Sequence, residues 1–233
     1  MISRLKSIFR PTEKRTMTQR DPAGWEDILG PTTRAGVAVT TETALGVPAA
    51  LRAVTLLSGA VASLPLKVYR RTLEGRELAQ DTETYRLLHK EPNPMQTPFT
   101  FKELIMNHLL LNGNFYAYID RKPAGLVALW PLNPTAVAVE QDPITGVITY
   151  RVYTTQGVQV LQPWEVVHIL GITLDGVRGI SPVTLARESL GGAIAELRYG
   201  QSFFQNSANL SGVLQHPGHL GKEAAETLRE SWR

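Results

Sequence analysis

The side chains able to do acid–base or metal chemistry are few and scattered in this chain of 233 residues. It has five histidines and no cysteine, which excludes disulfides, thiolate zinc sites and cysteine nucleophiles. His216 and His219 are the closest histidine pair, but they bracket Pro217 and Gly218 in a predicted turn, with no carboxylate at ligand spacing. An ordinary polar turn is the simpler interpretation, so we expect neither a metal nor a cofactor.

His168 and Asp175 are the remaining candidates for catalysis. His168 lies inside the apolar run VVHIL, where a hydrogen-bonded core histidine is expected, and Asp175 lies in a glycine-rich loop without an identifiable partner base. The chain contains no P-loop, dinucleotide-binding or nucleophile-elbow motif. We therefore predict that the chain is not an enzyme. The alternative is a cryptic site, which would need a cluster of converging polar side chains.

Recognition of nucleic acid by a defined module is not indicated either. The sequence shows no zinc finger, helix-turn-helix spacing or aromatic RNA-binding motif. Tyr116, Tyr118 and Trp130 fall on predicted strands, where aromatic side chains either pack a sheet or stack on bases. Packing is the more frequent role, and we expect it for all three.

The basic charge of the chain is concentrated at its N-terminus. Residues 1–20 carry six basic side chains and one acidic one, whereas the other 213 residues carry 18 basic and 20 acidic groups. The isoelectric point near 9.2 therefore reflects an N-terminal arm and not the body. A domain that held DNA over its whole surface would be basic throughout.

The arm has an amphipathic beginning. Ile2, Leu5, Ile8 and Phe9 fall on one helical face, with basic residues around it. This pattern fits a helix that docks on a membrane surface or a partner, or else a solvated tail that orders only on assembly. No apolar run of about 7–15 residues follows the charges, so a secretory signal is not indicated. No stretch approaches the ~18–20 apolar residues of a membrane span.

The elements of the body begin after residue 35. Apolar residues at three- and four-residue spacing predict a helix over 47–63, with Pro48 in its first turn. Thr100 and Glu103 form a predicted capping box that opens another helix, which should end at Asn112 and Gly113. The predicted elements of this half are the helix over 47–63, a hairpin over 65–79, a short helix over 84–90 and a helix over 100–111.

The middle of the chain is rich in β-strand patterns. Alternating apolar and polar residues, separated by turn sequences such as DPITG and TTQG, predict six strands. We expect them to form an antiparallel sheet with two or three helices packed on it, which is an α+β arrangement. The predicted strands are 115–121, 126–132, 135–141, 147–153, 158–162 and 166–170.

A long helix is predicted over 181–206. Ser181 and Pro182 provide an N-cap and a first-turn proline, and no proline follows for some 24 residues, which corresponds to about 36 Å of helix. Gly191 and Gly192 would let another backbone come close. Such a long element in a small domain suggests that it packs against copies of itself or spans two domains.

The C-terminal part has a predicted strand over 211–215, a turn, and an amphipathic helix that begins near residue 222. This helix still continues at Arg233, without a cap, glycine or proline to end it. We therefore expect the chain to be a fragment of a longer protein or the product of a truncated gene.

Five segments of the chain follow one another in a characteristic order. They are TALGVPAALRAVTLLSGAVASLPLKVYRR (43–71), HKEPNPMQTPFTFKELIMNHLLLNGNFYAYIDR (89–121), GLVALWPLNPTAVAVE (125–140), PWEVVHILGITLDGVRGISPVTLARESL (163–190) and NSANLSGVL (206–214). Each alone is ordinary helix or strand sequence. Together, over about residues 40–233, the chain resembles the portal proteins of tailed phages of the HK97 type.

This resemblance implies an α+β fold in four parts. A basic, flexible arm (1–35) would precede an antiparallel, β-rich wing domain with packed helices (36–180). A long stem helix (181–207) would follow, and then the start of a small α/β clip domain (208–233). The rest of the clip, a second stem helix, a channel loop and the crown of the family would lie beyond Arg233.

The resemblance also implies a function and partners. Portals of this family form a dodecameric ring at one capsid vertex, and double-stranded DNA passes through it without sequence specificity during packaging and ejection. The implied partners are other copies of the chain, the large terminase subunit, the major capsid protein and head–tail adaptor proteins. The implied locations are the virion and, during assembly, the host cytoplasm. A head–tail adaptor or another minor virion protein is the alternative.

The resemblance identifies no DNA-contacting residue directly. On the predicted stem helix, Arg187 and Arg198 are candidates for contact with DNA in the channel, and intersubunit salt bridges are the equally plausible role. Gly191 and Gly192 are the candidates for close helix packing.

Overall fold

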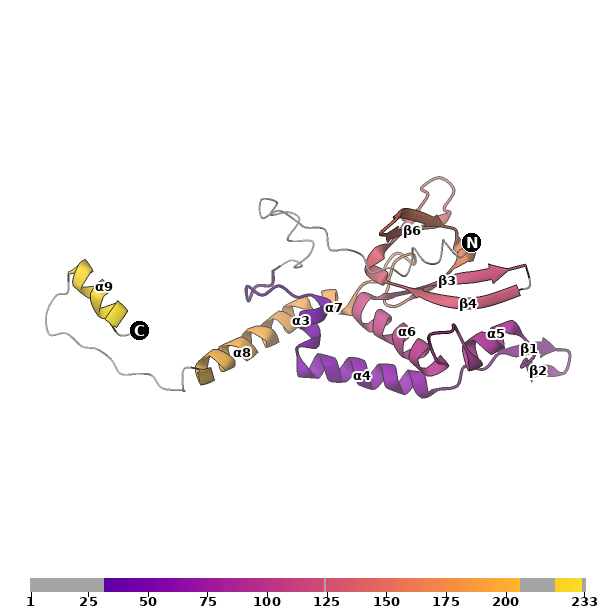
Figure 1. Cartoon of the computed structure of the whole chain (residues 1–233), viewed down its shortest axis with the longest axis horizontal. Coiled ribbons are helices and arrows are strands. Elements are labelled where there is room, and N and C mark those ends of the chain that lie inside the picture. Colours follow the sequence, from indigo (N-terminus) through magenta and orange to yellow (C-terminus); the bar gives the residue numbers. More distant parts are fainter. Residues whose placement is uncertain (1–31, 124, 206–220, 232–233) are drawn as a thin grey trace. The chain divides into compact units, whose positions relative to one another are not determined.

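The computed structural model describes residues 32–123, 125–205 and 221–231 (Figure 1). The chain divides into two compact units, of which the first ends at Glu196 and the second begins at Leu197. The first unit has an α+β fold, as expected. The predicted strand over 211–215 and the pair His216 and His219 lie outside the described residues.

Two helices open the first unit. Helix α3 (Thr41–Leu45) begins with a capping box in which the Thr40 and Thr43 side chains each accept the other residue's backbone N–H. Helix α4 (Pro48–Ser63) confirms the helix predicted over 47–63, with Pro48 at its first position, where a missing N–H costs nothing. Its small buried residues Ser58 and Ala62 let it pack closely against α6.

A hairpin and an irregular helix follow. Strands β1 (Tyr69–Thr72) and β2 (Gly75–Leu78) pair antiparallel and confirm the predicted hairpin, with shorter strands than the range 65–79 suggested. Helix α5 (Glu83–Tyr85) continues directly as a π-helical turn, Arg86–Lys90. Together they confirm the short helix predicted over 84–90.

Helix α6 (Pro98–Asn112) begins earlier than predicted. Its N-cap is Thr97, whose hydroxyl accepts the N–H of Thr100, so the predicted capping box of Thr100 and Glu103 is wrong. The reason is Pro98, which has no N–H to satisfy and takes the first helical position in place of Thr100. Gly113 ends the helix in the left-handed conformation, as predicted, with φ of 75°.

The six predicted strands form two three-stranded antiparallel sheets instead of one. The first sheet has the order β4–β3–β8 and the second the order β5–β6–β7. The chain leaves the first sheet at Asn133, whose side chain accepts the N–H of Thr135 and turns Pro134–Ala136 into a 3-10 helix. The strands are β3 (Asn114–Lys122), β4 (Gly125–Leu132), β5 (Val137–Gln141), β6 (Ile148–Thr154), β7 (Gly157–Leu161) and β8 (Val166–Leu170).

The first sheet is the central layer of this unit. Successive residues of β3 point to opposite faces. Phe115 and Ala117 pack with α6 and the π-helical turn, whereas Tyr116 packs with the second sheet. In Figure 1 helix α6 lies along one side of β3 and β4, with α4 beneath it. The core on the far face is formed by Tyr116, Leu132, Val139, Tyr150, Val152, Leu161 and Val166.

The long helix predicted over 181–206 is interrupted. Helix α7 (Pro182–Leu185) is followed by Ala186 with φ of −91° and ψ of 10°, and α8 (Arg187–Gln205) begins after it. The N–H of Ala186 is shared between the carbonyls of Pro182 and Thr184, so one turn tightens without any proline or glycine to signal it. The 19 residues of α8 correspond to about 28 Å.

In the second unit, helix α9 (Lys222–Ser231) confirms the helix predicted from residue 222. Among the helices that the structure describes, none is long and apolar enough to cross a membrane.

Candidate interaction surfaces

A tight backbone contact joins the start of β3 to the loop before α7. Gly113 and Gly179 lie so close that a side chain on Gly113 would overlap the carbonyl of Ile180, and one on Gly179 would overlap the carbonyl of Gly113. Asn114 completes the contact, because its side chain accepts the N–H of Gly179 at 2.7 Å and donates to the Gly179 carbonyl at 2.8 Å. The segment that leads into α7 is thereby fixed to the central sheet.

Asp175 organises the loop that ends in this contact. Its carboxylate accepts the N–H groups of Val177 and Arg178, both at 2.8 Å, and the hydroxyl of Thr173. Hydrogen bonds from two backbone N–H groups lower the pKa of the Asp175 carboxyl to about 2. The N–H of Arg178 has the larger effect and that of Val177 the next largest. Asp175 is therefore a turn-forming residue of a folded loop.

His168 on β8 belongs to the core, as predicted. Its Nε2 lies 3.1 Å from the Asn114 side-chain oxygen and its Nδ1 lies 3.3 Å from the Tyr150 hydroxyl, while its ring stacks on Tyr116 at 4.4 Å. Burial lowers the pKa of His168 to about 4, so the ring is neutral at pH 7. The histidine thus links the central sheet, the second sheet and the contact at Gly179.

The aromatic side chains considered for base stacking lie within or against the sheets. Tyr116 is buried in the core between the sheets, and burial raises the pKa of its hydroxyl to about 12. Tyr118 is partly buried against the same core. Trp130 on β4 is the cross-strand partner of Tyr118 on β3. Packing, as expected, is their role.

The two candidate arginines of α8 lie in different environments. Arg187 is partly buried, and its Nε has no hydrogen-bond partner within the part of the chain that the structure describes. Arg198 is exposed. Three ion pairs of the described residues join Arg70 to Asp81, Arg151 to Glu140 and Arg178 to Asp175, and none of these three involves Arg187 or Arg198.

The two candidate glycines of α8 also differ. Gly191 is buried, and a Cβ there would lie 2.5 Å from the side chain of Thr33. The close backbone approach at Gly191 is therefore made inside this chain, by the segment that precedes α3. A Cβ on Gly192 would meet nothing within 4 Å.

An apolar groove lies beside the start of α8. Helix α4 supplies one wall through Ala50, Ala53, Val54 and Leu57. The groove holds about 250 Å³, and Leu57 on its wall is 47% exposed. The other residues that line it come from α3, the end of α6, α7 and α8: Ala44, Leu45, Leu110, Leu111, Pro182, Val183, Ala186 and Leu190.

Sequence reasoning missed this groove. The three- and four-residue spacing of Ala50, Ala53 and Leu57 is a signal for an apolar helix face, but it does not indicate whether that face is covered. The side of the helix that stays open depends on where α6 and α7 lie, and a sequence pattern does not contain that placement.

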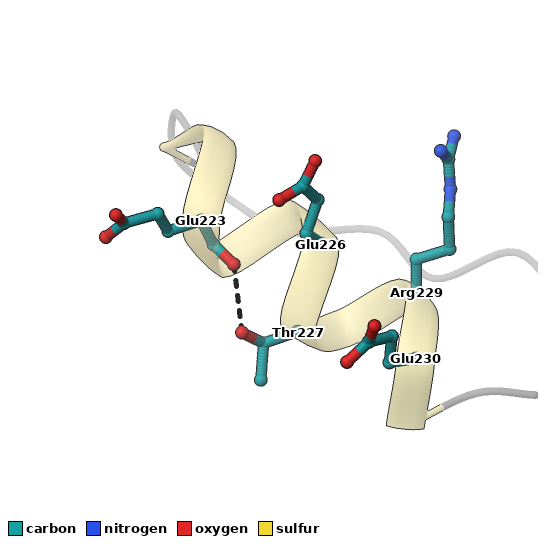
Figure 2. A pocket seen from close by; sticks show the side chains of 5 residues that line it. All are labelled: Glu223, Glu226, Thr227, Arg229 and Glu230. Carbon is teal, nitrogen blue, oxygen red and sulfur yellow. Dashed lines mark hydrogen bonds between the residues drawn. The ribbon is translucent and has the colours of Figure 1, made fainter.

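The second unit presents a polar helix. Figure 2 shows Glu223, Glu226 and Glu230 of α9 pointing away from one another, with Arg229 on the same helix. The hydroxyl of Thr227 donates to the carbonyl of Glu223 at 2.9 Å. Within the described ranges no group of three or more His, Asp or Glu side chains could hold a metal ion.

Comparison with known proteins identifies relatives over most of the chain. Residues 48–233 match the family described as phage portal protein. The "Probable portal protein" of Streptomyces phage phiC31 is 32% identical over 230 residues, which is 95% of this chain and 50% of that protein. This chain spans about half the length of the curated relatives that it matches.

Solved structures show the same fold. The crystal structure of an HK97 family phage portal protein from Corynebacterium diphtheriae is 26% identical, with a TM-score of 0.55 over 85% of this chain and 59% of that one. A chain in the neck of the native gene transfer agent particle, computed with C12 symmetry, is 21% identical with a TM-score of 0.59. That alignment covers 99% of this chain and 58% of the neck chain.

Proposed function

Because this chain belongs to the phage portal protein family, we propose that it is a subunit of a ring at one capsid vertex, through which double-stranded DNA passes during packaging and ejection. The observation that carries this proposal is the family match over residues 48–233, on a chain that folds as a layered α+β domain followed by a long helix.

The distribution of charge supports a channel through which DNA slides. Residues 21–233 carry 18 basic and 20 acidic groups, so the body has no net excess of positive charge with which to attract phosphates. Each contact with a DNA phosphate adds affinity, and that contact must be broken at the next step of translocation. A nearly neutral body therefore suits passage without sequence specificity better than retention of DNA.

In this proposal the parts of the chain have distinct roles. Residues 36–180 form the wing, 181–207 the stem helix and 208–233 the start of the clip, with 1–35 as the arm. The ring would be a dodecamer located in the virion, after assembly in the host cytoplasm. It would dock the large terminase subunit, the major capsid protein and head–tail adaptors, and the role would be structural with no catalytic step.

Negative-stain electron microscopy with native mass spectrometry tests the ring. The protein is expressed to its natural stop codon and examined over a range of concentrations. We expect rings with a central hole and a mass close to twelve subunits. Monomers alone at every concentration, from a reading frame that supplies the remaining stem and crown, would contradict the proposal.

Arg187 and Arg198 are proposed as residues of the channel or of the subunit interface. The single variants Arg187→Gln and Arg198→Gln distinguish the two roles in the assembled ring. A channel residue leaves ring yield unchanged at low and high salt, whereas an interfacial ion pair makes the variant ring fall apart at a lower salt concentration. Glu196→Gln, at another exposed position of α8, is the control for a simple change of net charge.

A further inference from the structure

We propose that the apolar groove beside α8 is the docking site of the chain's own N-terminal segment, residues 2–9. The groove leaves part of the apolar wall of α4 open to solvent, since Leu57 on that wall is 47% exposed. Ala50, Ala53 and Leu57 form that wall. Every residue that lines the groove is apolar. An apolar recess of this kind is a binding surface for an apolar segment.

The chain enters the described structure next to this groove. Thr33 packs on Gly191, which directly follows the groove residue Leu190, and the N–H of Arg34 donates to the carboxylate of Glu188. Val37 then joins the same apolar cluster as Ile194. The point at which residues 1–31 join the described structure therefore lies close to the groove.

The tether formed by residues 10–31 is long enough to reach the groove. It is also short enough to favour docking within one chain over docking between chains. Residues 10–31 separate segment 2–9 from the described structure, and a flexible chain of that length has an end-to-end distance of about 26 Å. A tether of this reach gives an effective concentration near the millimolar range. Even a weak apolar contact would then be occupied for much of the time.

The pattern of segment 2–9 matches the groove. Ile2 and Phe9 are separated by the same number of residues as Ala50 and Leu57, so both apolar faces are about 10.5 Å long as helices. Leu5 lies between them on the same face. A cavity of about 150 Å³ is enough to take one benzene ring, so a groove of about 250 Å³ has room for more than one of these side chains.

Disulfide trapping tests this contact directly, because the natural chain has no cysteine that could interfere. The pair Leu5→Cys and Leu57→Cys places one thiol on the apolar face of the segment and one in the groove. The control pair, Ser7→Cys and Leu57→Cys, uses a residue on the opposite face, with almost the same tether. We expect the first pair to form its intrachain disulfide about tenfold faster or more under mild oxidation.

Limited trypsin digestion of the unmodified sequence gives a second measurement. Docking should slow cleavage after Lys6 by about tenfold or more relative to cleavage after Arg15, a factor that corresponds to about 1.4 kcal/mol. Leu57→Glu should remove this protection. Leu73→Glu at the fully exposed tip of the β1–β2 hairpin should not.

Three outcomes would overturn the proposal. Equal disulfide rates for the two pairs, together with equal trypsin rates after Lys6 and Arg15, mean that segment 2–9 does not enter the groove. Disulfides that form only between chains mean that a second copy fills it. Co-sedimentation of the chain with anionic vesicles through residues 1–20, without the intrachain disulfide, assigns the segment to a membrane surface instead.

Discussion

Gly113 and Gly179 show how much a single missing side chain can matter in this protein. Gly113 has φ of 75°, and a Cβ there would overlap the carbonyl of Ile180. Gly113→Ala should therefore lower the free energy of unfolding by at least about 2 kcal/mol, since both a left-handed backbone and a displaced neighbour are costly.

Denaturant unfolding, followed by tryptophan fluorescence, measures this effect. The control is Gly192→Ala, whose new methyl group meets nothing within 4 Å. It should leave stability unchanged or raise it by up to about 1 kcal/mol, because glycine inside a helix is less favourable than alanine. Equal effects of the two substitutions would show that the contact at Gly113 is not rigid.

Two partly buried histidines make stability depend on pH. Burial lowers the pKa of His108 and of His168 to about 4, below the ordinary value of 6.5. The unfolded chain then binds more protons than the folded one between these two pH values, so stability is lost as pH falls from about 6.5 to about 4. Asp175 does not contribute in this window, because its pKa of about 2 affects stability only below its ordinary value of 3.8.

His108→Leu checks this pH dependence. The Nδ1 of His108 has no partner among the described residues, and its ring lies against Phe115. The leucine variant should be at least as stable as the natural protein at pH 7.5 and more stable at pH 5, with a gain of at most about 3 kcal/mol at lower pH. An unfolding free energy with the same pH profile as the natural protein would contradict the assignment.

Among the elements, helix α6 provides the clearest test of a helix end. Thr97 caps the helix through the N–H of Thr100, whereas Glu103 takes no part in the cap. Thr97→Ala should cost about 1 kcal/mol of stability. Glu103→Ala should change it by less than about 0.5 kcal/mol. Thermal unfolding by circular dichroism compares the stabilities of the two variants. A larger loss for Glu103→Ala than for Thr97→Ala would support the capping box that the sequence predicts.

Local sequence signals were sufficient to predict a helix end where a single residue type determines the backbone conformation. Pro48 at the start of α4 and Gly113 at the end of α6 are where the sequence predicts them, because each restricts the backbone by itself. The strands were also predicted within a few residues. The interruption at Ala186 was missed because alanine carries no helix-breaking signal.

Features that depend on tertiary contacts could not be predicted from local patterns. The division of six strands into two sheets depends on how the chain turns at Asn133, and the groove depends on the placement of α4 beside α7. His168 was correctly assigned to the core, but its bond to Asn114 joins residues 54 positions apart. The sequence alone does not indicate which residues so far apart along the chain form a hydrogen bond.

At the scale of the whole molecule, the basic arm should dominate non-specific binding to DNA. Residues 1–20 hold six basic side chains and one acidic one, and the remainder has a small acidic excess. Deleting residues 1–20 should therefore abolish retention of DNA in a gel-shift assay at 50 mM salt, and the natural chain should lose it by 200 mM. Retention by the shortened chain would reveal a basic surface on the body that composition does not predict.

The contacts of Gly179 and Gly191 also constrain how the gene can change over time. Gly179 is held by Asn114 and Gly191 by Thr33, so the segment of 11 residues between them has a fixed length. Losing or gaining a single codon in this interval would rotate Gly191 by about 100° around the helix axis, away from Thr33. Related genes should therefore differ in length at the hairpin tips and keep this interval constant, even where its amino acids diverge.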